Sequence, residues 1–426
     1  MVYSGNSISG EVIMLPIVTY PSFIESVLPR FSPIFTKPQL RHFAEYLTGL
    51  VVSPNKTVTG INTQFLGHTN QSSKNHFLTQ SNWEDQQVTD ARLKLVKEHC
   101  IKHHVQDGLL VIDDSGAHKT GHHIEAANWF WDHSKHSYAF GHQIVTSQYV
   151  TKKFHVPLHY RLYQKEDDVG TDAFQSKLDL AIELIDEAVD SDIPFSCVAG
   201  DSWYFCTKII KHLESLSKDW VFACKSNRKV LFNNEWVQLK DLVKQLSKSD
   251  FKEVTISKTH GQQLTVWAFA KTLRMNNVGR VKILISYLDD VFVGNPFFLV
   301  TNRKEWPIAK MLTVYSQRWP IETFYRDAKQ HLGLERCELR MLRGIRRHWD
   351  LVFLAYTLLQ IESCTGTLTK WIKSNVVTIG TKSRMISCEL FRSFIFWAYQ
   401  YFDQGDNPDQ LFERAMLKNR QLRFNF

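Results

Sequence analysis

The stretch Gly108-Leu109-Leu110-Val111-Ile112-Asp113-Asp114-Ser115-Gly116 decides how this chain is expected to fold. Its first five residues form a continuous apolar run, which is typical of a strand buried on both faces of a sheet. We expect Asp113 to end this strand. The pattern recurs in Val198-Ala199-Gly200-Asp201-Ser202, where Asp201 follows the apolar run 195–199. One acid in this position is usually a turn or a helix cap. Two of them favour a site at the carboxyl edge of a sheet.

Further strands and helices alternate around these two runs. Apolar and alternating patterns predict strands over 138–149, 154–163, 220–224 and 297–300, and helices over 172–189, 205–216 and 308–332. Between 228 and 296 we find only short strand-like runs, separated by Asn233-Asn234, His260-Gly261 and Asn276-Asn277, which indicates a β-rich insertion. Three sequential strands followed by alternating units predict an α/β fold, a mixed sheet with helices on both faces.

The two ends of the chain are predicted to be helical. Residues 38–52 have helical periodicity, and the short stretches 58–66 and 72–78 are separated by Gly67-His68-Thr69. Such a pattern fits a helix-turn-helix that reads DNA, and fits any small helical bundle equally well. The apolar run 351–361 is about half of the ~20 residues that a membrane span needs, so we predict a buried core helix. We expect no secretion signal in residues 1–17, and therefore a soluble, cytoplasmic protein without a membrane partner.

A third acid lies in a helical stretch, Tyr315-Ser-Gln-Arg318-Trp-Pro-Ile-Glu322-Thr-Phe-Tyr-Arg-Asp-Ala-Lys329. At about 100° per residue, Tyr315, Arg318, Glu322 and Lys329 fall within one narrow stripe of the helix surface. A solvated face with ion pairs would give the same spacing. Pro320 predicts that the helix kinks or begins at that residue.

A mild excess of positive charge means only solubility when it is spread evenly, and it indicates a polyanionic partner when it is clustered. The chain has 426 residues and a formal net charge of +8, from 51 Lys and Arg against 43 Asp and Glu. Much of this excess lies between residues 318 and 348, and clustered positive charge is typical of nucleic-acid binding. The seven cysteines include no Cys-x-x-Cys pair, so neither a disulfide framework nor a cysteine-based zinc site is expected. Six of the histidines lie between 118 and 142, where Gly116 and Gly121 favour a loop, and we expect no metal site there.

Three carboxylates brought to one place would repel each other unless a divalent cation lies between them. Carboxylate oxygens are ligands that suit Mg²⁺ or Mn²⁺. Two such ions can activate an attacking oxygen and stabilise a leaving one, which is the chemistry of phosphodiester displacement. The acids therefore predict metal-dependent chemistry on a nucleic acid.

In these motifs the chain resembles a known family, the DDE transposases of bacterial insertion sequences. Tyr315, Arg318, Glu322 and Lys329 match their Tyr-x2-Arg-x3-Glu-x6-Lys signature. Residues 112–116 resemble their first motif, an Asp followed two positions later by Ser or Thr, and residues 200–204 resemble their second. The resemblance implies an RNase H-like core with a β-rich insertion before the catalytic Glu. The expected segments are a helical N-terminal domain (1–100), a split core (105–227 and 297–362), the insertion (228–296) and a C-terminal helical region (363–426).

The resemblance also implies roles for individual residues. Asp113, Asp201 and Glu322 would form the catalytic triad and hold Mg²⁺ or Mn²⁺, as two ions. A strand register shifted by one residue would make Asp114 the first ligand instead of Asp113. The residues implied to contact the DNA of the element ends, mainly its phosphates, are Tyr315, Arg318 and Lys329. The nearby positions that would extend this surface are Arg326, Arg343, Arg346 and Arg347.

The implied reaction is cut-and-paste transposition. Water would hydrolyse the DNA strand at the element end, and the resulting 3′-hydroxyl would attack target DNA. Two ends must be held together, so a homodimer in a synaptic complex is expected, associated with the nucleoid. The alternatives are an RNase H-like nuclease that cuts without joining, a domesticated DNA-binding protein that no longer cuts, and a metal hydrolase that acts on something other than nucleic acid.

Overall fold

The computed structural model describes residues 15–67, 70–121, 123–132, 135–257, 263–361 and 378–417. The chain divides into two compact units. One combines residues 1–88, 331–355 and 362–426, and the other combines 89–330 and 356–361. In this division residues 331–355 group with the N-terminal helices and the β-rich segment groups with the core, while the segment boundaries expected from the sequence stay a prediction. Of the expected C-terminal region, 363–377 and 418–426 lie outside the described residues.

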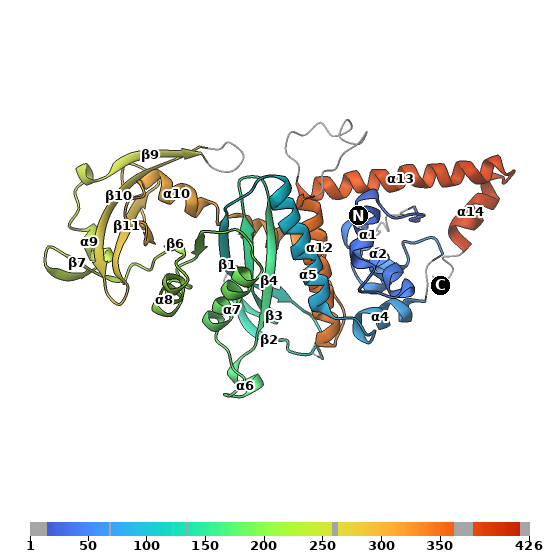
Figure 1. Cartoon of the computed structure of the whole chain (residues 1–426), viewed down its shortest axis with the longest axis horizontal. Helices are drawn as coiled ribbons and strands as arrows, with labels where there is room; N and C mark the ends of the chain where they lie inside the picture. Colours follow the sequence, from blue (N-terminus) through green and yellow to red (C-terminus); the bar gives the residue numbers. More distant parts are fainter. Residues whose placement is uncertain are drawn as a thin grey trace, which may run out of the picture. The chain divides into compact units, whose positions relative to one another are not determined.

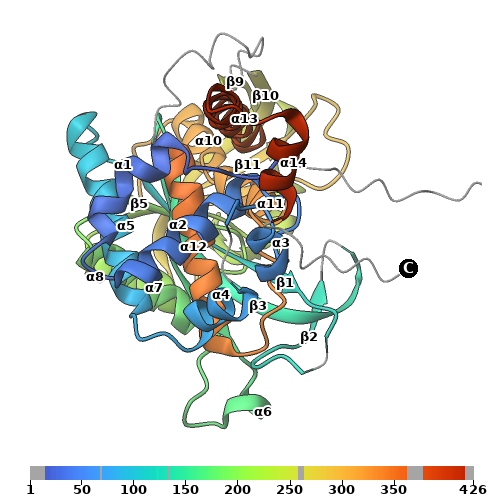
Figure 2. The same ribbon diagram turned by 90° about the vertical axis from the view of Figure 1, so that its right-hand side faces the viewer.

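The first unit is helical. It contains α1 (Ser22–Phe31), α2 (Lys37–Val52), α3 (Val58–Asn62), α4 (Gln71–Thr79), α13 (Ile379–Asp403), α14 (Pro408–Leu417) and the first part of α12 (Leu342–Ile361). Helix α2 begins with a capping box between Thr36 and Gln39, close to its predicted start. Figure 2 shows α12 alongside α2 and α4, in agreement with a hydrogen bond of 2.9 Å between Tyr46 Oη and His348 Nδ1.

The predicted helix-turn-helix segment contains α3 and α4. Helix α3 has only five residues, and His68 and Thr69 of the intervening turn lie outside the described residues. On α4, Lys74 is buried and pairs with the buried Glu45 at 2.8 Å. This cation therefore stabilises the packing of α4 on α2 and does not face a ligand. DNA reading by this segment stays a prediction.

The second unit is built on one mixed sheet. Within the described residues its strands are β1 (Leu109–His118), β2 (Asn128–Asp132), β3 (Ser137–Val150), β4 (His155–Tyr163), β5 (Cys197–Gly200), β6 (Asp219–Ala223), β7 (Lys229–Phe232), β8 (Glu235–Gln238), β9 (Lys252–Ser257), β10 (Gln263–Met275), β11 (Gly279–Tyr287) and β12 (Phe297–Thr301). They follow the order β2-β3-β1-β5-β6-β12-β11-β10-β7-β8, with β4 on β3 and β9 on β10. The pairs β1–β5 and β5–β6 are parallel, and the others are antiparallel.

Helices flank this sheet (Figure 1). They are α5 (Asp85–Lys102), whose first residues are grouped with the first unit, α6 (Glu166–Val169), α7 (Lys177–Asp190), α8 (Thr207–Ser215), α9 (Leu239–Val243), the 3₁₀ turn Lys248–Asp250, α10 (Ile308–Ser316) and α11 (Pro320–His331). Helix α7 packs against β3 and β4, and α10 packs against β6, β9 and β10. The predicted α/β fold class is confirmed, and the arrangement is consistent with an RNase H-like fold.

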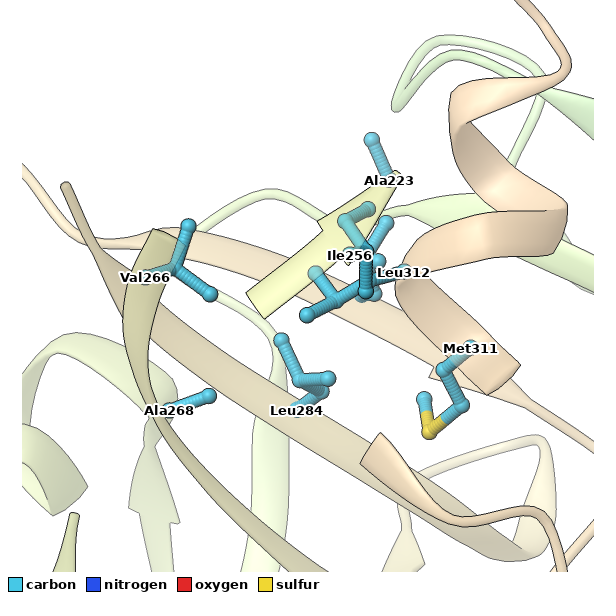
Figure 3. Packing of buried hydrophobic residues seen from close by; sticks show 8 residues of the cluster. Ala223, Ile256, Val266, Ala268, Leu284, Met311 and Leu312 are labelled. Carbon is cyan, nitrogen blue, oxygen red and sulfur yellow. The ribbon is translucent and has the colours of Figure 1, made fainter. Parts of the chain in front are cut away.

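The β-rich segment is continuous with the core sheet. β11 pairs with β12, and β12 pairs with β6. Figure 3 shows the hydrophobic cluster that fixes this join, with Ala223, Ile256, Val266, Leu284 and Met311 among its side chains. The predicted turn at Asn233-Asn234 connects β7 to β8, and both residues have positive φ, as a tight hairpin turn requires. The second predicted turn, His260-Gly261, lies outside the described residues.

Strand β1 is longer than the sequence predicts. Asp113 lies in its middle, and Gly116, expected in a loop, lies inside the strand. A Cβ atom at Gly116 would come within 2.3 Å of the Phe130 ring, so the glycine makes room for a side chain of β2. The hairpin β2–β3 therefore replaces most of the expected histidine-rich loop, of which His122 and His133 lie outside the described residues.

We predict that Gly116→Ala lowers the free energy of unfolding by about 1–3 kcal/mol, because the new methyl group has no space beside the Phe130 ring. Urea denaturation measures this loss. The loss should shrink when Phe130 is also changed to Leu, and a double-mutant cycle quantifies the coupling. Gly121→Ala is the matched control, since its Cβ would approach nothing closer than 3.6 Å. Equal losses from Gly116→Ala and Gly121→Ala would contradict the packing argument.

Candidate active site

Asp113 and Asp114 are neighbours on β1 and point to opposite faces of the sheet, because side chains alternate along a strand. The Asp114 carboxylate is occupied by two donors. Lys177 Nζ donates to it at 2.6 Å and the Tyr204 hydroxyl at 2.9 Å. Burial, followed by the charge of Asp114, holds the pKa of Tyr204 well above its usual value, so this hydroxyl stays a donor. Asp114 thus serves the packing of α7 and of the turn that contains Tyr204.

Asp113 meets the third predicted acid through one arginine. Arg318 Nη1 lies 2.9 Å from Asp113 Oδ2, and Arg318 Nη2 donates to the Glu322 carboxylate. The Arg318 side chain is only 15% exposed, and its guanidinium lies 5.9 Å from the centre of the Tyr315 ring. α10 ends at Ser316 and α11 begins at Pro320, so Arg318 lies in the break that the proline predicted. This break turns the guanidinium toward β1.

Asp201 follows the end of β5, as predicted. Because β5 runs parallel to β1 with Ile112 beside Gly200, the two acids follow paired residues on adjacent strands. Asp201 Oδ1 accepts hydrogen bonds from the backbone N–H groups of Trp203 at 2.8 Å and Tyr204 at 3.3 Å. These bonds fix its orientation at the sheet edge.

The electrostatics of Asp113 reflect this crowding. The pKa of Asp113 is raised to about 7, mainly by burial. The charges of Asp114 and Asp201 act in the same direction, whereas Arg318 and the backbone N–H of Asp114 act in the opposite direction. A buried carboxylate surrounded by like charges is stabilised by any cation that comes near it. In the structure that cation is the Arg318 guanidinium.

Helix α11 is held across β1 by two further side chains. Lys329 Nζ donates to the backbone carbonyl of Gly116 at 2.7 Å, and the Tyr325 hydroxyl donates to that of Asp113 at 3.1 Å. Lys329 was predicted from the sequence as a DNA contact, and its present partner is protein. Tyr325 is not among the site residues that the sequence predicts. Both bonds keep Glu322 on the Asp113 side of the sheet.

The three predicted metal ligands supply hard carboxylate oxygens, which suit Mg²⁺ or Mn²⁺. Among the residues that the structure describes, no three His, Cys, Asp or Glu side chains lie close enough together to hold an ion. At this site the carboxylates of Asp113 and Glu322 are kept apart because the Arg318 guanidinium lies between them. The three carboxylates are of the type that binds a divalent cation. In the structure the Arg318 guanidinium supplies the positive charge between Asp113 and Glu322.

The remaining predicted DNA contacts differ in exposure. Arg326 is 57% exposed and pairs with Asp327 at 3.2 Å. Arg343 and Arg346 are exposed on α12. Arg347, however, is completely buried, with its guanidinium 3.9 Å from the centre of the Trp83 ring. It donates to the backbone carbonyls of Phe77, Leu78 and Trp83 and pairs with Asp85. This burial disagrees with a DNA-contacting role for Arg347, because the side chain already satisfies the ends of two chain segments.

Comparison with known proteins identifies one family. Residues 30–240, about half of the chain, match the model of a family described as DDE superfamily endonuclease. No curated protein matches the chain. Among the described residues, no helix is both long enough and apolar enough to cross a membrane.

We predict that Arg318→Gln increases the affinity of the DNA-free protein for Mn²⁺ about tenfold, because the carboxylates of Asp113 and Glu322 lose their internal cation. Electron paramagnetic resonance of free Mn²⁺ measures the affinity without any activity assay. Lys177→Gln is the matched control, since it removes a cation from Asp114 on the opposite face. Unchanged or weaker Mn²⁺ binding by Arg318→Gln would show that the arginine organises the carboxylates without competing for them.

We predict that Arg347→Ala lowers the free energy of unfolding by about 3 kcal/mol, because buried carbonyl groups lose their donor. Urea denaturation measures the loss, and Arg340→Ala, at an exposed position, should change stability by no more than about 0.5 kcal/mol. A different result would support a phosphate contact. The Arg347→Ala protein would then be stable, and the slope of log K for DNA binding against log salt concentration would become shallower by about one.

Proposed function

This chain belongs to a DDE transposase-type family, and we propose that it is a transposase that excises a DNA element and joins it to target DNA. The family supports nuclease- or transposase-type activity on DNA. The observation that carries the finer proposal is the single contact network in which Arg318 joins Asp113 to Glu322 on the face of β1. This network brings the acid of the first motif to the Arg and Glu of the signature, although about 200 residues separate them.

The proposed roles follow from the contacts. Asp113, Asp201 and Glu322 would hold Mg²⁺ or Mn²⁺, which when bound supplies activation of an attacking oxygen and stabilisation of a leaving one. Asp201 is oriented for this by two backbone N–H groups. Tyr325 and Lys329 position α11, and therefore Glu322, against β1.

Arg318 would exchange one anion for another. A guanidinium donates two parallel hydrogen bonds to a phosphate as readily as to a carboxylate. When a DNA phosphate comes within reach, Arg318 can transfer to it and release Asp113 and Glu322. DNA binding and the freeing of the carboxylates would then be one coupled event, which restricts cutting to the DNA-bound protein.

The proposed reaction has two chemical steps, strand cleavage at the element end and attack of the 3′-hydroxyl on target DNA. A nuclease would carry out only the first. Two ends must be joined in one reaction, so we propose that the protein acts as a homodimer. An assay that resolves joined from cleaved products distinguishes the two activities.

We predict that Asp113→Asn, Asp201→Asn and Glu322→Gln each abolish Mg²⁺-dependent cleavage of a donor DNA that carries the element ends. Each protein should still bind these ends, because the substitutions leave the basic residues in place. Gel assays of cleavage and of binding measure the two properties separately.

Asp114→Asn is the matched control for the first acid. Its amide oxygen can still accept from Tyr204 and Lys177, so cleavage should stay within about tenfold of the unmodified protein. If Asp114→Asn abolished cleavage and Asp113→Asn did not, the first ligand would be Asp114. Cleavage by Glu322→Gln at the normal rate would overturn the proposed function.

A further inference from the structure

The β2–β3 hairpin displays large aromatic side chains to solvent. Trp129 is 50% exposed, Trp131 42% and Tyr138 68%. They form two cross-strand pairs, Trp129 with Phe140 and Trp131 with Tyr138, whose rings lie 5.7 and 5.2 Å apart in edge-to-face geometry. We call these four side chains the aromatic face of the hairpin. An exposed aromatic cluster of this kind commonly marks a binding surface.

The opposite face of the hairpin packs against β1. Phe130, between the two tryptophans, is buried over Gly116 and stacks on His118 with ring centres 5.8 Å apart. His118 Nε2 pairs with Asp132 Oδ2 at 2.9 Å. Phe130 therefore packs the hairpin against β1, while Trp129, Trp131 and Tyr138 of the aromatic face are exposed to solvent.

The aromatic face and Asp113 lie on the same side of the sheet. Asp113 pairs with Thr146 of β3, and paired residues share a face. Alternation along β3 then places Phe140 and Tyr138 on that face. The contact of Phe130 with Gly116 agrees with this assignment, because their partners Ala139 and Gln143 share the other face.

A cation lies between the aromatic face and the acids. Lys329 contacts β1 at Gly116, whose partner Gln143 is three residues from Phe140, or about 10 Å along β3. Tyr138 is eight residues, or about 27 Å, from Thr146, the partner of Asp113. A strand whose phosphates pass Lys329 can therefore lay its bases on the hairpin.

We propose that the aromatic face of the hairpin binds unpaired bases of single-stranded DNA by stacking, an inference that rests on the proposed action on DNA. Aromatic rings on a sheet beside cationic groups are a common platform for single strands, because every base offers a π face. Base pairs in a duplex stack on one another and cannot offer these faces. The site would take the strand that becomes unpaired when an element end is opened or cut.

The test compares single-stranded and duplex DNA on the full chain. The probe is a fluorescently labelled oligothymidylate, with a duplex of equal length beside it, and anisotropy measures both affinities. The variant Trp129→Ala/Trp131→Ala/Tyr138→Ala should bind the single strand at least about tenfold more weakly and bind the duplex nearly as before. Replacing all three residues by Phe keeps the rings and should keep most of the single-strand affinity.

Trp236→Ala is the matched control, because Trp236 is 46% exposed on β8 and belongs to no part of the aromatic face. Unchanged single-strand affinity in the triple Ala variant would overturn the inference, as would an equal loss of both affinities. A change of oligomeric state in that variant, seen by light scattering, would overturn it in favour of an interface between copies of the chain. Failure of the unmodified protein to cleave or join DNA, with selective single-strand binding intact, would overturn the proposed function alone.

Discussion

Repulsion between carboxylates is the constraint on which the site of this protein depends. Asp113, whose side chain is 17% exposed, lies close enough to Asp114 and Asp201 for both charges to raise its pKa. Such an arrangement persists only when each charge is compensated, since an unpaired buried carboxylate costs several kcal/mol. Two cations, one on each face of β1, provide this compensation. Lys177 compensates Asp114 on one face, and Arg318 compensates Asp113 and Glu322 on the other.

Strand β1 is the element that makes this separation possible. It pairs with β3 over its whole length and with β5 over its first four residues, so its two faces are fixed by backbone hydrogen bonds on both sides. Where β5 ends, the polar half of β1 begins, and α11 lies across it through bonds to the carbonyl groups of Asp113 and Gly116. A hydrogen bond to a backbone carbonyl does not depend on the charge of the side chain at that position. The contacts of Tyr325 and Lys329 with β1 therefore do not depend on the protonation of the Asp113 side chain.

The sequence was informative where a local pattern carries the physics. Apolar runs followed by an acid located both Asp113 and Asp201, and helical spacing grouped Arg318 with Glu322. The failures arise where the cause is distant in the chain. Lys177 and Tyr204 lie 63 and 90 residues from Asp114 in the sequence, and the hydrophobic periodicity of the sequence does not predict such distant contacts. Gly116 indicated a loop by its usual preference, whereas the structure uses its missing side chain to admit Phe130.

The basic cluster between residues 318 and 348 shows that the sequence alone does not reveal which positive charges can contact DNA. In the sequence, Arg318, Lys329 and Arg347 each contribute one positive charge. In the structure their partners differ. Arg318 binds two carboxylates, Lys329 binds a backbone carbonyl, and Arg347 binds backbone carbonyls at the end of α4 and in the turn that follows it. Phosphate binding releases counterions only from cations that can reach DNA. Arg347 is buried and cannot do so without unfolding its surroundings. The role proposed for Arg318 would instead require it to exchange its carboxylate partners for a phosphate. The number of charges in a sequence therefore sets an upper bound on the electrostatic contribution to DNA binding, and the partners of each charge determine how much of it is available.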